Sequence, residues 1–363
     1  MRIGIIGTRG IPNNYGGFEQ FAEHLAAGLV KKGHDVCVYN SHTHPFRGNT
    51  WNGVKIIHRV DPEKYIGIPG QFVYDFLCIC DSRKRNFDIL LQLGYTSSSV
   101  WHRLLPGKAK IVTNMDGLEW QRGKYSKSVQ RFLKYAESLA VKSSTLLVAD
   151  SEYIQHYLED LYQISPAYIS YGADIFSTPD PGRLLQFAVD PKKYFLLIAR
   201  MQPDNNIEEI IKGVINSKTT FPLLIIGNID GRFGKKMVQA YSSELIRFMG
   251  PIFEKETLNQ LRYFSRLYFH GHSAGGTNPS LLEAMAASAT ICANENPFSR
   301  EVLGQNAYYF SDYLQVSEIA RKLVNQPDSA LFVENNISRI KSGYAWHEII
   351  SNYESAFTDL LTK

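Results

Sequence analysis

The chain has 363 residues, of which 44% are hydrophobic and 20% charged, enough for two domains with their own cores and unlike a disordered or fibrous protein. Its net charge of +4 is too small to argue for nucleic acid, but it suits an anionic ligand or an anionic membrane surface. The four cysteines, at positions 37, 78, 80 and 292, have neither zinc nor disulfide spacing, which favours a reducing cytoplasm. We expect no signal peptide and no transmembrane helix, because no apolar run reaches about 18 residues.

Short apolar runs alternate with helical periodicity in the first half of the chain. We expect strands at residues 2–7, 35–39, 54–60, 88–93, 110–114, 145–149 and 167–172, and helices at 18–32, 70–82, 126–141 and 151–162. This alternation predicts a parallel sheet that is covered on both faces.

A segment rich in Pro, Gly and Asp at 173–192 is interpreted as a connection between domains. A second alternating run follows, with expected strands at 194–199, 222–226, 246–249, 266–269 and 290–293, and helices at 279–287 and 345–361. The fold class is therefore α/β, with two Rossmann-like domains that span 1–172 and 173–344 and face each other across a cleft. Ligands of such sheets bind outside the carboxyl ends of the strands.

A glycine-rich loop at residues 7–19 follows the first strand. One hypothesis is that the backbone of Gly16 and Gly17 approaches a diphosphate or sugar, with Arg9 adding positive charge. The alternative is a mobile surface turn. A dinucleotide site is disfavoured, because the glycines do not form G-x-G-x-x-G and the second strand ends at Asn40 instead of an acid.

The most informative segment is His272 to Ala286, in which a glycine-rich loop leads into a helix. Pro279 is suited to the first helical position, and the unbonded N–H groups at a helix start can hold an anion. Glu283 lies about one turn further on, near enough to reach a ligand hydroxyl. These features predict a site for a phosphate joined to a polyol, built by Gly275, Gly276, Thr277, Asn278, Ser280 and Glu283.

Arg200 follows the first strand of the second half and precedes a helix. Its guanidinium could pair with a phosphate, although a lone arginine in such a loop is more often a solvated cation. His270 and His272 flank a glycine and are interpreted as hydrogen-bonding loop residues, since no further metal ligands accompany them.

Several ordered segments along the chain carry a resemblance to a known family. The Arg200 turn, the sequence GGTNPSLLEAMA and the Trp-containing final helix resemble glycosyltransferase family 4, which consists of retaining enzymes of GT-B fold. The segments GTRGIPNNYGGFE and NMDGLEW resemble its bacterial rhamnosyltransferase-like branch. The resemblance covers nearly the whole chain and implies that the final helix, 345–363, packs back on the first domain.

The resemblance assigns roles residue by residue. Glu283 matches the second of two family acids and would bind the ribose diol, whereas Gly275 stands where the first acid would be. Arg200 matches the family arginine on the donor diphosphate, but Asn205 replaces the accompanying lysine, so Arg9 or another base would have to compensate. Gly250 matches a turn that contacts the base, and Asp116 stands where the family has a catalytic histidine. Apart from the resemblance, Tyr15 and Glu119 are expected at the acceptor. Asp116 and Glu119, just after a strand, could orient an acceptor hydroxyl or the donor sugar, or could simply be an acid pair favoured at a helix N-terminus.

The expected function is transfer of a sugar, with rhamnose favoured, from a dTDP- or UDP-linked donor to a glycan or lipid-linked glycan in surface polysaccharide synthesis. Neither a cofactor nor a metal ion is expected, since no D-x-D pair lies in a plausible loop. The alternatives are a non-catalytic sugar-nucleotide binding protein and a nucleotide-sugar epimerase. Lys127, Arg131 and Lys134 share a helix face that could meet anionic lipid in a peripheral contact, or could simply be solvated.

Overall fold

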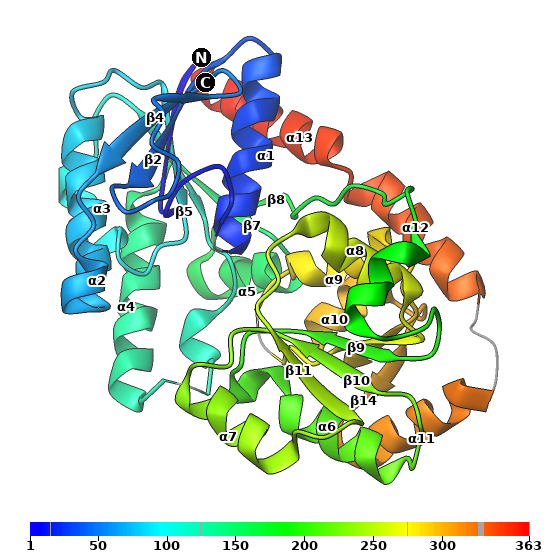
Figure 1. The fold of residues 1–363 in the computed structure, drawn as a ribbon. Helices are drawn as coiled ribbons and strands as arrows, with labels where there is room; N and C mark the ends of the chain where they lie inside the picture. The colour runs from blue at the N-terminus through cyan, green and yellow to red at the C-terminus, as the bar shows by residue number, and fades with distance from the viewer. Residues whose placement is uncertain (15, 124, 274, 326–329, 363) are drawn as a thin grey trace. The chain divides into compact units, whose positions relative to one another are not determined.

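The computed structural model describes residues 1–14, 16–123, 125–273, 275–325 and 330–362, and the chain divides into two compact units (Figure 1). The first unit contains Met1–Gln121, Tyr125–Tyr171 and the segment from Trp346 onward. The second contains Arg122, Gly123 and Gly172–Ala345.

The first unit is built on a sheet with the strand order β3-β4-β2-β1-β5-β6-β7-β8. Neighbouring strands are parallel except for the β3–β4 hairpin. The strands are β1 Arg2–Ile6, β2 Asp35–Ser41, β3 Thr50–Trp51, β4 Val54–Arg59, β5 Ile89–Leu93, β6 Lys110–Asn114, β7 Leu146–Ala149 and β8 Ala167–Tyr168. The helices are α1 Gly17–Lys31, α2 Glu63–Ile66, α3 Pro69–Ser82, α4 Lys127–Ser143, α5 Glu152–Tyr162 and α13 Trp346–Thr362, with 3₁₀ turns η1 Ser99–Leu104 and η2 Glu119–Gln121.

The second unit has a sheet in which all paired strands are parallel, with the order β11-β10-β9-β12-β13-β14. The strands are β9 Phe195–Ile198, β10 Leu223–Ile226, β11 Ile246–Gly250, β12 Leu267–His270, β13 Ile291–Asn294 and β14 Tyr308–Phe310. The helices are α6 Ile207–Asn216, α7 Arg232–Tyr241, α8 Lys255–Phe264, α9 Pro279–Ala286, α10 Pro297–Leu303, α11 Tyr313–Asn325 and α12 Ala330–Gly343, with 3₁₀ turns η3 Pro181–Phe187 and η4 Pro203–Asn205.

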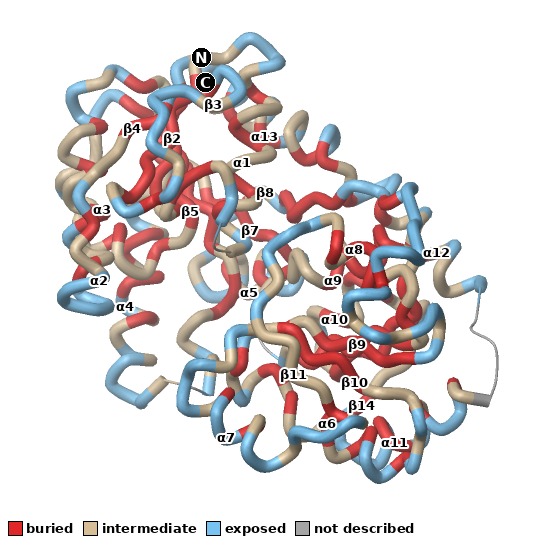
Figure 2. Tube along the Cα trace, viewed as in Figure 1, coloured by how far each residue is buried: buried red, intermediate tan, exposed pale blue. Residues whose placement is uncertain are grey.

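Burial follows the sheets, since the central strands of both units are buried (Figure 2). In the second unit, Phe195, Leu197 and Phe269 of β9 and β12 pack with Ile210 and Ile211 of α6 in one apolar cluster. The predicted parallel sheets are confirmed. They could be predicted because strands covered on both faces have continuous apolar sequences.

Two strands were missing from the sequence-based prediction. The β3–β4 hairpin turns at Asn52 and Gly53, which both have positive φ angles, of 47° and 81°. Asn-Gly is the preferred pair for such a two-residue turn, so this signal was present in the sequence. The strand β14 is only three residues long and lies at the sheet edge, where the apolar pattern is weak.

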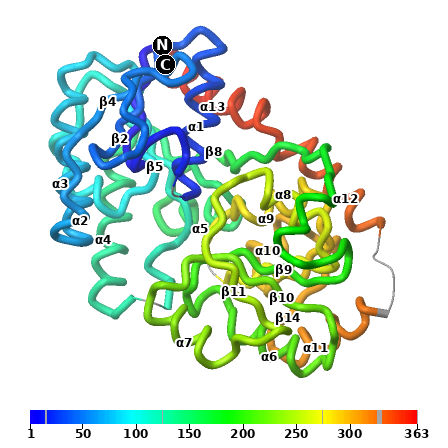
Figure 3. The backbone as a smooth tube through the Cα atoms, in the orientation of Figure 1, coloured from blue at the N-terminus to red at the C-terminus, as the bar shows by residue number. Residues whose placement is uncertain are grey.

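The final helix α13 belongs to the first unit, where the red end of the chain returns to the blue helix α1 (Figure 3). The ring of Tyr353 lies 5.4 Å from that of Phe21, and Trp346 stacks on His24 at 4.3 Å. The carboxylate of Glu354 pairs with Lys32 at 2.7 Å and His34 at 2.8 Å. Both apolar and charged contacts therefore hold this helix on α1.

Candidate functional site

The turn after β9 presents Arg200 on the surface of the second unit. Asn205, only 4% exposed, donates from Nδ2 to the carbonyl oxygen of Arg200 at 2.6 Å. A Cβ atom at Gly271 would lie 2.0 Å from the carbonyl oxygen of Asn205, so β12 approaches this turn closely. Asn205 thus fixes the backbone that carries Arg200, which is a positioning task that a lysine could not perform in the same way.

The loop between β12 and α9 is fastened to the same turn. Ser273 donates from both its backbone N–H and its hydroxyl to the carbonyl oxygen of Asp204, at 3.1 and 2.8 Å. Asn278 is the N-cap of α9, accepting from the N–H of Ser280 at 2.9 Å, and Pro279 occupies the first turn. The structure therefore brings Arg200 and the start of α9 to the carboxyl ends of β9 and β12.

Glu283 forms a buried ion pair that the sequence did not reveal. Its Oε2 lies 2.5 Å from Nη2 of Arg262, whose side chain is 1% exposed, whereas 15% of the Glu283 side chain is exposed. Arg262 also donates to Asn259 Oδ1 at 3.1 Å and to Ser280 Oγ at 3.3 Å. The carboxylate is consequently fixed from its buried side while part of it remains accessible. The available signal was an arginine beside Leu261 on the inner face of α8.

Gly250 ends β11 beside the same edge of the sheet. Its carbonyl oxygen accepts from the N–H of Gly227 at 3.0 Å, its φ angle is +73°, and a Cβ atom there would meet open space. Gly275 also has a positive φ angle, +133°, while Gly276 and the buried Thr277 complete the loop before α9. The predicted donor residues of the second half therefore gather at the carboxyl ends of adjacent strands.

His270 and His272 form a stacked pair, with ring centroids 4.6 Å apart. Neither Nδ1 has a hydrogen-bond partner among the described residues, so the prediction that both rings are hydrogen-bonded in the loop is wrong at these atoms. Burial, assisted by the Arg262 charge, lowers the pKa of His270 to about 3, and burial lowers the pKa of His272 well below its usual range. The two neutral rings line a small recess with Gly276, Asn278 and Asn296.

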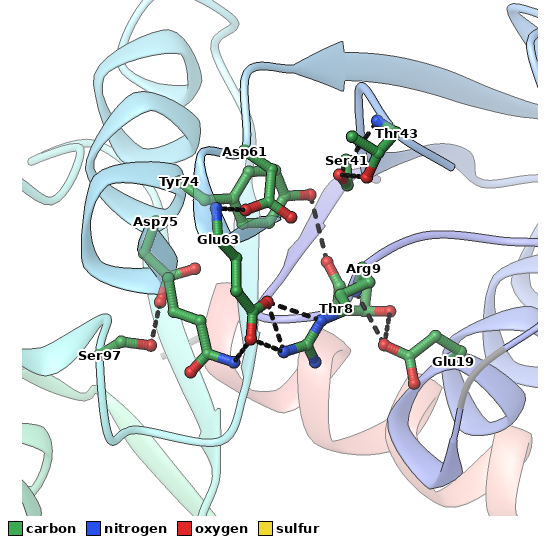
Figure 4. Close-up of polar contacts among 11 residues, drawn as sticks. Thr8, Arg9, Glu19, Ser41, Thr43, Asp61, Glu63, Tyr74, Asp75 and Ser97 are labelled. Carbon is green, nitrogen blue, oxygen red and sulfur yellow. Dashed lines mark hydrogen bonds and ion pairs between the residues drawn. The ribbon is translucent and has the colours of Figure 1, made fainter. Parts of the chain in front are cut away.

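In the first unit, Arg9 is already paired. Its Nε and Nη2 atoms donate to both carboxylate oxygens of Glu63, at 3.0 and 2.8 Å (Figure 4). Gln71 donates to the same carboxylate at 3.1 Å. The Arg9 charge is therefore balanced by Glu63 at the start of α2, and a diphosphate would have to compete for it.

The glycine-rich loop is ordered by side chains of its own unit. Glu19, 3% exposed on α1, accepts from the Thr8 hydroxyl at 3.1 Å and from the Arg9 N–H at 2.8 Å. Asn40 exchanges two hydrogen bonds with the backbone of Ile11, at 3.0 and 2.8 Å. The described part of this loop is thus tied by hydrogen bonds to α1 and β2. Asn40 lies near the end of β2, and its side chain holds the loop backbone.

Gly16 is the N-cap of α1 and Gly17 its first residue, so both lie at a helix start as expected for an anion site. Tyr15, assigned to the acceptor from the sequence, lies outside the described residues. The roles of Gly16 and Gly17 in ligand binding stay predictions.

Asp116 and Glu119 follow β6. Asp116 has a positive φ angle of 51°, its N–H donates to Asn114 Oδ1 at 2.9 Å, and its Oδ1 accepts from the Tyr171 hydroxyl at 3.3 Å. Glu119 begins η2 and accepts from the Tyr125 hydroxyl at 3.4 Å. A left-handed backbone held by such contacts gives Asp116 a fixed orientation, which suits a catalytic or orienting role.

Lys134 does not belong to a cationic helix face. Its ammonium group lies 2.8 Å from the buried carboxylate of Glu137 and sits over the rings of Trp120 and Tyr157, at 4.6 and 4.5 Å from their centroids. The predicted set of three cations thus reduces to the exposed Lys127 and Arg131, which weakens the case for contact with anionic lipid. No helix among the described residues has the length and apolarity to cross a bilayer.

A family model described as "Domain of unknown function (DUF1972)" matches residues 93–174. No curated protein sequence matches the chain. Among solved structures, sucrose-phosphate synthase from Thermosynechococcus elongatus is similar with a TM-score of 0.81 and 14% identity, over 99% of each chain. HepE (Alr3699) from Anabaena, in complex with UDP and glucose, has a TM-score of 0.75 and 12% identity, over 99% of each chain. A glycosyltransferase from Rickettsia africae has a TM-score of 0.71 and 15% identity, over 100% of this chain and 98% of that one. These similarities establish the GT-B fold of glycosyltransferases.

Proposed function

We propose that the chain is a retaining, metal-independent glycosyltransferase of family 4, which moves a sugar from a nucleoside diphosphate to a glycan or lipid-linked glycan in surface polysaccharide synthesis. The observation that carries this proposal is the meeting of Arg200, the start of α9 and the Glu283 carboxylate at the carboxyl ends of parallel strands. That arrangement offers a cation and the positive end of the α9 dipole for a diphosphate, and an acceptor for ribose hydroxyls.

In this proposal the protein supplies no nucleophile. Arg200 and the α9 start stabilise the negative charge that builds on the departing diphosphate, and a donor phosphate oxygen takes the proton of the acceptor hydroxyl. Glu283, fixed by Arg262, orients the ribose. Gly275 offers no carboxylate to the donor sugar, which suits a deoxysugar such as rhamnose. Asp116 orients the reacting hydroxyl. Glu119 contacts the acceptor, and any membrane contact would be peripheral.

A thermal-shift panel of UDP, dTDP, GDP and ADP, each alone and as a sugar conjugate, with and without EDTA, tests the donor site. We expect one nucleotide to raise the melting temperature selectively and insensitively to EDTA, and dTDP-rhamnose to be the best conjugate. No shift with any nucleotide would contradict the proposal. Loss of the shift with EDTA would contradict metal independence.

Turnover measurements distinguish a transferase from the two alternatives, a non-catalytic sugar-nucleotide binding protein and a nucleotide-sugar epimerase. A transferase releases nucleoside diphosphate only when an acceptor accepts the sugar, a binding protein releases none, and an epimerase changes the sugar without an acceptor.

Arg200→Ala should lower kcat about 100-fold or more, as expected for loss of one charged group that stabilises a leaving group. Full activity of that variant would exclude the role assigned to Arg200.

A further inference from the structure

Large apolar side chains are exposed together on the first unit, where α2 leads into α3. Tyr65 and Ile66 end α2, Ile68 is the N-cap of α3, and each of these residues is more than half exposed. Single exposed apolar residues are ordinary on a protein surface, whereas a group of large ones marks a surface that meets a partner.

The neighbouring helix α4 adds positive charge to this apolar strip. The ring of Phe72 on α3 lies 5.8 Å from that of Phe132 on α4, so the two helices are in contact (Figure 1). Lys127 and Arg131 of α4 are exposed and four residues apart, which places them on one face of the helix. We define the α2–α4 surface as Lys64, Tyr65, Ile66, Ile68, Lys127 and Arg131.

The exposed charge around this surface has one sign. The segments that carry it, 60–80 and 126–136, are described throughout and contain three carboxylates, at Asp61, Glu63 and Asp75. The two aspartates are buried, and Glu63 forms an ion pair with Arg9 at 2.7 Å. The cations of the α2–α4 surface therefore have no exposed carboxylate beside them within these two segments.

This combination of side chains is suited to the interface of an anionic bilayer. Aliphatic side chains insert among the acyl chains, a tyrosine ring lies at the level of the headgroups, and lysine and arginine attract the negative leaflet. The helix α4 alone offers a bilayer only two cations, and the strip on α2 supplies the apolar part that can insert.

The α2–α4 surface also borders the glycine-rich loop. The Arg9 guanidinium of that loop donates to both carboxylate oxygens of Glu63, the first residue of α2 (Figure 4). The loop follows β1 at the carboxyl end of the first sheet, which is the end where ligands of such sheets bind. A bilayer on this surface would therefore lie beside the ligand-binding end of the first unit.

We propose that the α2–α4 surface docks on an anionic lipid bilayer, with Ile66 and Ile68 among the acyl chains and the cations at the headgroup phosphates. This inference rests on the proposed function, from which it selects the lipid-linked glycan as the class of acceptor. Docking keeps the first unit at the membrane surface, where such an acceptor is anchored.

Flotation of the full chain with lipid vesicles tests the docking. The wild type should bind vesicles of phosphatidylcholine mixed with phosphatidylglycerol more tightly than vesicles of phosphatidylcholine alone, and added salt should weaken this preference. The double variant Ile66→Ser, Ile68→Ser should bind the mixed vesicles about 10-fold or more weakly, because its apolar contact is lost. The matched control is Leu185→Ser, Leu331→Ser, which removes two exposed leucines from the second unit and should bind as the wild type does.

A second pair of variants tests the charge. Lys127→Gln with Arg131→Gln should lower the affinity for the mixed vesicles about 10-fold, since each cation near an anionic leaflet contributes to binding. Lys235→Gln with Lys236→Gln removes the same charge from exposed positions on α7 and should have no such effect. Equal losses in both pairs would mean that net charge, and not this surface, decides binding.

All four variants should keep the melting temperature of the wild type, because the replaced side chains are exposed. The inference is overturned if the wild type floats with neither kind of vesicle, or if Ile66→Ser, Ile68→Ser binds as well as the wild type. It is also overturned if light scattering shows a wild-type dimer that this variant converts to a monomer, since the surface is then a contact between two copies of the chain. If nucleotides raise the melting temperature but vesicles do not bind, only this inference fails, whereas vesicle binding without any nucleotide shift contradicts the proposed function.

Discussion

The pair of Arg262 and Glu283 illustrates how a single ligand-facing side chain depends on a buried partner. Arg262 is 1% exposed and has no access to water that could replace Glu283. Breaking a buried ion pair leaves an uncompensated charge, whereas breaking a surface pair costs little. The carboxylate assigned to the ribose is therefore also a structural element of the second unit.

Glu283→Gln should lower the free energy of unfolding by about 3 kcal/mol, because the Arg262 charge stays buried without its counter-ion. Urea unfolding followed by circular dichroism measures this change. Glu295→Gln is the matched control, since Glu295 pairs with Arg300 at 2.6 Å but both side chains are more than a third exposed. The control should change stability by less than about 1 kcal/mol. Equal losses in the two variants would contradict this account.

Asp75 is another buried carboxylate, 5% exposed, that accepts from the Ser97 hydroxyl at 2.5 Å in the first unit (Figure 4). Burial raises its pKa from 3.8 to about 6. Because the folded state holds this proton more tightly than the unfolded state, Asp75 causes stability to fall as the pH rises from 3.8 to about 6.

Asp75→Asn should therefore gain stability relative to the wild type as the pH rises, by on the order of 3 kcal/mol between pH 3.8 and pH 7. Melting temperatures of both proteins across this range give the comparison. Asp190→Asn, at a carboxylate 71% exposed, should show no such trend. If the difference in melting temperature between Asp75→Asn and the wild type does not vary with pH, burial of the charged Asp75 carboxylate is ruled out as the cause.

At the scale of elements, the first glycines of the loop after β1 serve packing between strands. A Cβ atom at Gly7 would lie 2.3 Å from the carbonyl oxygen of Leu93 in β5, and its φ angle is +86°. At Gly10 a Cβ atom would lie 2.4 Å from the Asn40 side chain. These glycines are required by the fold itself, whatever ligand the loop meets.

Replacing such a glycine by alanine has a steric cost and a backbone cost. Gly33 allows the two costs to be separated. Its φ angle is +90°, but a Cβ atom there would have no neighbour within 4 Å. Gly33→Ala should cost about 1 to 2 kcal/mol from the left-handed backbone alone. Gly7→Ala should cost at least about 2 kcal/mol more, because Leu93 must move. Thermal unfolding of the two variants distinguishes the effects, and equal costs would mean that the strands adjust freely.

At the scale of the whole molecule, the final helix α13 completes the fold of the first unit. Tyr353 is fully buried against Phe21 and Phe357, and its hydroxyl accepts from Asn114 Nδ2 at 3.0 Å. The final helix thus reaches Asn114 at the end of β6, two residues before Asp116. A residue near the end of the chain supports the segment assigned to catalysis.

Tyr353→Ala should destabilise the first unit by about 3 to 5 kcal/mol, the usual cost of truncating a large buried aromatic side chain. Hydrogen exchange measured by mass spectrometry should become faster in residues 1–171, with little change in 172–345. Tyr65→Ala, at a tyrosine 76% exposed, is the control and should leave both regions unchanged. Faster exchange confined to the second unit would contradict the assignment of α13 to the first.

Local patterns were sufficient for the α/β class and for most elements. Buried parallel strands are apolar throughout, and Ser126 and Ser151 cap α4 and α5 as serines before a helical pattern should. The start of α9 was also predictable, because Asn278 and Pro279 have local roles.

The remaining features of the site depend on segments that are distant in the sequence. Arg262 meets Glu283 across two helices, Glu63 neutralises Arg9, and Arg122 reaches the loop at Gly275. In the sequence, Asn205 only marks the absence of the family lysine. Its hydrogen-bond partner is a backbone carbonyl oxygen, which no side-chain pattern reveals. Each of these contacts is decided by tertiary packing, which single-sequence periodicity does not encode.

The placement of α13 also orders events during synthesis. The ribosome makes residues 172–345, which contain all strands described in the second unit, before it makes Trp346–Thr362. The first unit must therefore wait for α13, with the α13-facing side of α1 uncovered, until the segment of the second unit has been made. Although it is begun first, the N-terminal unit is completed last, and this interval is when a nascent-chain chaperone would have an apolar surface to bind.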